Sequence, residues 1–168
     1  HVGKKTRFSK RFEKLKEEVV SDERYEGVME DLQLYLTKLD GVDMPTKLKD
    51  GGFTDREIWR AARRKESYWK KLERNKYFES AQWINSQLFA KIVMDFEQYV
   101  ERKLIWKGAT KDDILDAVNE QVVRPVLELI NEEGEYDDIL NFTADDVYGM
   151  IFFLTGKCHI NWVDYDNL

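Results

Sequence analysis

Apolar residues recur every three or four positions along most of the chain, which is the spacing of one face of an α-helix. The clearest stripe has six members: Ala81, Ile84, Leu88, Ile92, Phe96 and Val100. A similar stripe near the start has four members: Phe8, Phe12, Leu15 and Val19. Alternating strand patterns are nearly absent. The sequence therefore predicts an all-α fold, a compact bundle of five to six helices with no significant sheet.

Capping residues predict where several helices begin. Thr54 and Glu57 have the spacing of a capping box, and Ser80 is placed to cap the long apolar helix that follows. Thr110 and Thr143 each precede a pair of aspartates, which the N-terminal end of a helix dipole favours. We expect Gly108 and Gly156 to end helices, with Gly156 in a left-handed turn, and we expect a kink at Pro125.

One long loop divides the predicted bundle. We expect residues 1–168 to form a single helical domain, with an N-terminal helical hairpin over 5–40, a loop over 40–53 and a main bundle over 54–168. The second helix of the hairpin is predicted to begin at Ser21 and to end before a left-handed Gly41. A loop of this length between helices hints at an interaction role.

Composition limits the class of protein. The 168 residues are 42% hydrophobic, enough for a core without disulfides or metal, and no apolar run is long enough to span a membrane. The single cysteine excludes an internal disulfide and a cysteine-rich zinc site. The start at His1 rather than Met suggests a piece of a longer protein. With no signal-like stretch and no paired cysteines, we expect a cytoplasmic location.

Charge is distributed unevenly around a net value of −6. Residues 56–78 carry nine basic and three acidic groups, whereas residues 110–168 carry three basic and fourteen acidic groups. Segments of opposite charge can pair within the fold, or they can offer a basic surface to nucleic acid and an acidic surface to a basic protein. The acidic total argues against a dedicated nucleic-acid binder.

Catalytic and metal-binding patterns are weak. Cys158 and His159 are adjacent, so their side chains diverge and form a poor dyad, although His159 with a spatially adjacent acid remains one enzymatic alternative. Acidic pairs such as Asp112–Asp113 are explained by helix capping. Gly51–Gly52 only faintly resembles an anion-binding turn. We predict no catalytic residues, no metal ligands and no cofactor.

A basic helix offers the alternative function, contact with nucleic acid. Its aromatic residues, among them Trp59, alternate with basic ones, and such a pattern can bind phosphates and stack bases. The candidate residues are Arg60, Arg63, Arg64, Lys70, Lys71 and Arg74. The competing interpretation is that the basic side chains cover the core with their stems and pair with nearby acids.

Three segments carry a resemblance to a known family. They are YFESAQWINSQLFAKIVMDFEQYV (Tyr77–Val100), VVRPVLELI (Val122–Ile130) and YGMIFFLTGKCHINW (Tyr148–Trp162). The last, with its terminal LTGKCHINW, is the most specific. Together they resemble the helical C-terminal domain of ABC-three-component anti-phage systems, which combine an SMC-like ATPase with partner proteins.

The resemblance implies a domain that docks an effector to other protein subunits of the same system and does not itself catalyse. From the lack of a long apolar run we expect no membrane partner, and the sequence does not indicate an oligomeric state. Within the terminal motif, Ile160 and Trp162 lie two positions apart and share one face if the tail is extended. They either pack on the domain's own core or, together with His159, bind a partner.

Overall fold

The computed structural model describes residues 6–167, and all of their regular structure is helical. The α-helices are α1 (Arg7–Val20), α2 (Glu30–Leu36), α3 (Met44–Asp50), α4 (Asp55–Asn75), α5 (Glu79–Phe96), α6 (Lys111–Ala117), α7 (Arg124–Glu133) and α8 (Ala144–Gly156). Two π-helical stretches, η1 (Glu97–Glu101) and η3 (Val118–Val123), and two 3₁₀ turns, η2 (Ile105–Lys107) and η4 (Tyr165–Asn167), complete the set.

The all-α prediction is confirmed, but the number of helices was wrong. α6, η3 and α7 follow one another without a break, so the described residues form seven helices rather than five to six. None of them is long and apolar enough to cross a lipid bilayer.

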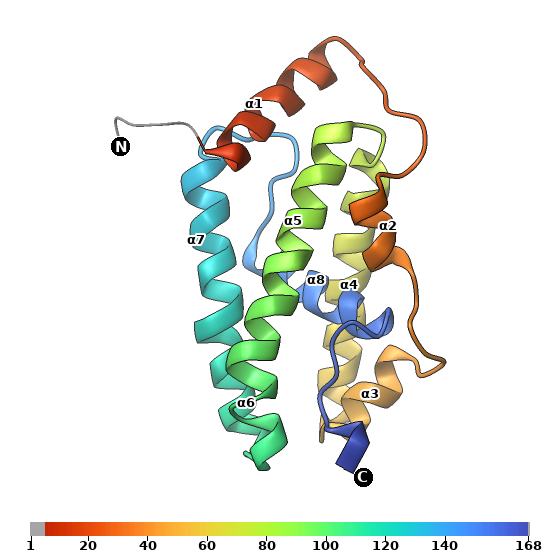
Figure 1. The fold of residues 1–168 in the computed structure, drawn as a ribbon, viewed down its shortest axis with the longest axis vertical. Helices are drawn as coiled ribbons and strands as arrows, with labels where there is room; N and C mark the ends of the chain where they lie inside the picture. The colour runs from red at the N-terminus through yellow and green to blue at the C-terminus, as the bar shows by residue number, and fades with distance from the viewer. Residues whose placement is uncertain (1–5, 168) are drawn as a thin grey trace.

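The long helices lie lengthwise and the short ones cover their ends and sides (Figure 1). α5 packs against α1, α2 and the η3–α7 segment, and α8 packs chiefly on α4. α1 lies across one end of the bundle, whereas α3, α6 and the C-terminal tail meet at the other end (Figure 1). The two ends of the molecule therefore present different elements to solvent.

The core is centred on α5 and α8. α8 is buried on nearly every side from Asp146 to Thr155, and it approaches α4 closely at Gly149. A Cβ atom at Gly149 would lie 2.4 Å from the Arg64 carbonyl oxygen, so only glycine fits this contact. Tyr68 of α4 is fully buried beside it and donates a hydrogen bond of 2.6 Å to Asn85 of α5.

The prediction that a second helix begins at Ser21 was wrong, because α2 begins only at Glu30. Left-handed backbone at Asp22 (φ 51°) and Gly27 (φ 89°) interrupts the helical path. Tertiary hydrogen bonds hold the intervening chain instead: the Met29 N–H donates to Gln82 Oε1 at 2.7 Å. α1 and α2 both pack on α5.

Several local predictions also need correction. The loop predicted over 40–53 contains α3, which begins with an Asp43 side chain that accepts from the Thr46 N–H at 2.9 Å. Ser80 does not cap α5; it is buried in the first turn and donates to Glu18. Gly41 and Gly156 are not left-handed, and Cys158 (φ 69°) makes the turn after α8.

Other boundaries agree with the sequence. The capping box of Thr54 and Glu57 is present, and Thr110 and Thr143 cap α6 and α8. Gly108 adopts φ 71° after η2. Near Pro125 the irregularity takes the form of the π-helical η3 immediately before α7, which accommodates a residue without an N–H donor.

Candidate docking groove

The terminal motif fastens the chain to itself. The Cys158 thiol donates to Asp40 Oδ1 at 2.7 Å, and His159 Nε2 lies 3.0 Å from the Thr37 carbonyl oxygen. Both contacts hold the connection between α2 and α3 against the end of α8. The end of α8 and the residues that follow it therefore act as a clasp, which we define as Thr155–Trp162.

A buried lysine extends the clasp. Lys47 of α3 has no exposed surface, and its ammonium group donates to Asp40 Oδ2 at 3.0 Å and to the Asn161 side-chain oxygen. The thiol of Cys158, followed by the Val42 N–H and Lys47, lowers the pKa of Asp40 to about 2, since each stabilises the carboxylate. One acidic side chain thus links the clasp to α3.

Trp162 anchors the end of the clasp in the core. Its ring is 3% exposed and packs edge-on against Phe53 and Phe96, with centroids 5.1 and 5.0 Å away. Its Nε1–H donates to Thr155 Oγ1 at 3.1 Å. Ile160 is 2% exposed. Of the three residues predicted to bind a partner, only His159 keeps substantial exposed surface, and that prediction stays untested.

The basic helix is partly engaged within the fold. Lys71 pairs with Asp146 at 2.6 Å, and Arg64 pairs with Asp145 at 3.3 Å. The remaining four predicted nucleic-acid contacts are exposed on α4: Arg60, Arg63, Lys70 and Arg74. The Arg63 guanidinium covers the exposed Trp59 ring at 4.8 Å. Nucleic-acid binding by this helix stays a prediction.

Within residues 6–167, no carboxylate forms an ion pair with His159. Its ring contacts are the Thr37 carbonyl oxygen and the edge of Tyr35, with ring centroids 5.4 Å apart. The aspartate pairs of α6 and α8 lie in first turns, where Thr110 and Thr143 cap the same helices. Stabilisation of the helix N-termini therefore explains why aspartates occupy these positions.

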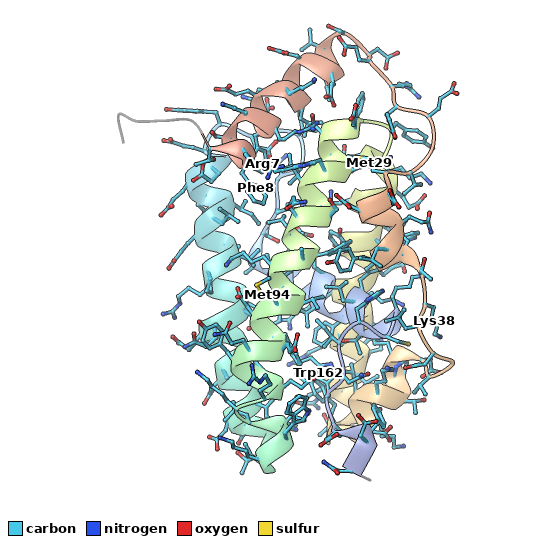
Figure 2. The ribbon with its side chains drawn as sticks, in the orientation of Figure 1. Arg7, Phe8, Met29, Lys38, Met94 and Trp162 are labelled. Carbon is cyan, nitrogen blue, oxygen red and sulfur yellow. The ribbon has the colours of Figure 1, made fainter. Side chains whose placement is uncertain are left out.

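A groove opens beside the clasp, where α3, η2, α6 and the tail meet. It encloses about 370 Å³. Its lining is Asp50, Gly51, Ile105, Trp106, Gly108, Ala109, Lys111, Ile114, Trp162, Val163, Asp164 and Asn167. The buried edge of Trp162 and the side chain of Ile114 supply apolar floor, whereas Trp106 is half-exposed. Figure 2 shows Trp162 toward the end of the bundle opposite Arg7.

Carboxylates dominate the charge around this groove. Lys111 is already paired with Glu57 at 2.7 Å, whereas Asp164 lies near Glu101. Burial, then the charges of Glu97 and Asp164, raises the pKa of Glu101. A cation brought into the groove would relieve this repulsion. We define the docking groove as the lining given above.

Sequence reasoning missed the docking groove. Trp106 and Asp164 lie 58 positions apart and come together only because the tail folds back toward η2. An available signal was Trp106 itself, a large aromatic residue two positions before Gly108 and outside the apolar stripes. Such a residue on a turn is a candidate contact residue.

Residues 6–167 thus form an all-helical domain with the clasp and the docking groove side by side at one end. Residues 43–162 match the family described as C-terminal domain 9 of the ABC-three component (ABC-3C) systems, and the chain belongs to that family. The resemblance carried by the three segments is thereby confirmed. No curated protein and no solved structure matches the chain.

Proposed function

We propose that this domain is a non-enzymatic interaction module that docks an effector to partner subunits of an ABC-3C defence system. The family supports membership of a multi-component system. The observation that carries the proposal is the docking groove, in which Trp106 is 50% exposed above an apolar floor. Tryptophan is one of the residue types enriched among those that contribute most of the binding energy at protein interfaces.

The chemistry of the docking groove indicates the kind of partner. The lysine in its lining, Lys111, is already paired with Glu57, and Glu101 and Asp164 repel each other. We therefore expect a segment of another subunit that inserts an apolar side chain next to Trp106 and places Lys or Arg near Asp164. The carboxylates would set orientation and association rate, and the apolar contact would supply most of the affinity.

The first experiment is co-purification of the domain with each protein encoded beside its gene, followed by a salt titration. We expect one partner to bind and its association to slow as salt rises, because salt screens the attraction to Asp164. Asp164→Asn should reduce that salt dependence. If none of these proteins binds at micromolar concentration, the proposal is wrong.

A further inference from the structure

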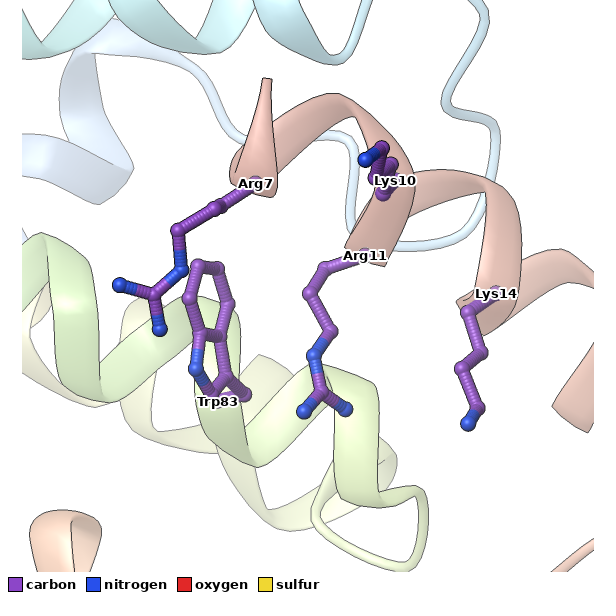
Figure 3. Close-up of a pocket in the computed structure, with 5 residues that line it drawn as sticks. All are labelled: Arg7, Lys10, Arg11, Lys14 and Trp83. Atoms are coloured by element: carbon purple, nitrogen blue, oxygen red, sulfur yellow. The ribbon is translucent and has the colours of Figure 1, made fainter. Parts of the chain in front are cut away.

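A second open surface lies at the other end of the bundle, between α1 and α5. It is a groove of about 300 Å³ lined by Arg7, Lys10, Arg11, Lys14 and Trp83. The four basic residues occupy positions i, i+3, i+4 and i+7 of α1, so they share one helix face. Figure 3 shows Arg7, Arg11 and Lys14 reaching from α1 toward α5. We define these five residues as the basic cradle.

Trp83 holds the two arginines in place. The guanidinium carbons of Arg7 and Arg11 lie 5.5 and 5.3 Å from the centroid of its ring, and the ring stands between them (Figure 3). Phe8 packs edge-on against the same ring at 5.1 Å. Cation–π contacts of this kind restrict the guanidinium groups before any ligand arrives.

The charge of the basic cradle is not neutralised inside the described part of the chain. None of its four basic side chains forms an ion pair with a carboxylate of residues 6–167. Glu18, further along α1, is buried. Its carboxylate accepts hydrogen bonds from the Ser80 N–H at 3.0 Å and from the Ser80 hydroxyl at 2.7 Å. Arg11 donates to that hydroxyl at 3.4 Å. Four cations thus line one groove in a chain whose net charge is −6.

We infer that the basic cradle binds the phosphate backbone of a nucleic acid. Its lining is four cationic side chains around Trp83, and because that ring is only 6% exposed the groove offers no open aromatic anchor. Protein interfaces have cores depleted in charge, so an acidic protein would lack an apolar anchor here. Base stacking is also excluded as the main contact, since the two arginines already flank the ring. Contacts to phosphate alone predict binding that is independent of sequence.

The basic cradle suits this ligand better than the exposed row on α4. Acidic neighbours do not separate the two, since Glu66 lies beside Arg63 and Lys70 on α4 and Glu13 and Glu17 follow Lys10 and Lys14 by three residues on α1. The row on α4 lines no groove among those described here, whereas the basic cradle concentrates its charges around one concavity.

The test uses fluorescence anisotropy with a labelled single-stranded oligothymidine and a labelled mixed-sequence DNA duplex at low salt. We expect both to bind, with an affinity that falls steeply as salt rises, by about one power of salt concentration for each phosphate contact. Lys10→Ala/Lys14→Ala removes two cations that do not touch the core. At about 50 mM salt it should weaken binding on the order of a hundredfold and lower the salt slope by about 2.

The matched control removes two exposed cations from α4, Lys70→Ala/Arg74→Ala, and should change affinity less than threefold. Circular dichroism melts establish that both double variants stay folded. Three results would overturn the inference: no binding of either DNA at low salt, a larger loss in the α4 variant than in the cradle variant, or binding of poly-glutamate as tight as that of DNA. None of these readouts depends on the docking groove.

Discussion

Two tryptophans line the same docking groove but differ in how deeply the fold buries them. Trp162 is 3% exposed and is surrounded by Phe53, Phe96 and Phe152, whereas Trp106 is 50% exposed on a 3₁₀ turn. The first has its apolar surface already buried by the fold, and the second still has half of its surface to bury. The comparison shows that the residue type in a motif does not decide whether it supports the fold or contacts a partner; burial does.

The largest expected effect comes from truncating the buried member of the pair. Trp162→Ala should destabilise the domain by about 3–5 kcal/mol, because it leaves a cavity among three phenylalanines and leaves Thr155 Oγ1 without its donor. Urea unfolding followed by circular dichroism measures this change. A loss below about 1 kcal/mol would show that the clasp is not part of the stable core.

A smaller loss is expected where the clasp meets α3. Lys47→Met keeps the length of the buried side chain and removes its hydrogen bonds to Asp40 and Asn161. Because the Asp40 side chain is 44% exposed, water can solvate it after the change, so we expect a loss of about 1–3 kcal/mol rather than the full penalty of an unpaired buried charge. The same unfolding assay applies, and a variant as stable as the parent would contradict this account of the clasp.

The smallest expected effect on the clasp is a loss of stability in acid. The pKa of Asp40 is lowered from its ordinary 3.8 to about 2 by the Cys158 thiol and by Lys47, so the folded state favours the carboxylate. Its contribution to stability is complete above about pH 4 and is lost as the pH falls toward about 2. Cys158→Ala should make this loss shallower, measured as the change in unfolding free energy between pH 5 and pH 3. An unchanged profile would argue against the thiol contact.

Much of the fold could be predicted from the sequence because its signals are local. The caps at Thr54, Thr110 and Thr143 depend on residues within one helical turn, and the stripe of α5 reflects its own burial. The segment before α2 could not be predicted, because its apolar residues fit a helical stripe. Tertiary contacts, such as the hydrogen bond from Met29 to Gln82, override that local preference.

The candidate surfaces were harder to predict. The docking groove joins η2 to the tail through long-range packing, and no local pattern brings Trp106 to Asp164. The basic cradle had a readable signal, four basic residues on one face of α1, but its significance depends on Trp83 from α5. The buried state of Trp162 was one of two alternatives that the sequence left open.

The most direct test of the account compares Trp106→Ala with Trp59→Ala in affinity for the partner subunit and in thermal stability. Trp59 is 59% exposed and lies on α4 outside the docking groove, so it is a matched control. Each variant loses a ring that is about half-buried, so both should lose a similar and modest unfolding free energy of about 1 kcal/mol. We expect Trp106→Ala to weaken binding at least about 30-fold and Trp59→Ala to leave it unchanged. Equal affinities for the two variants would contradict the assignment of the docking groove.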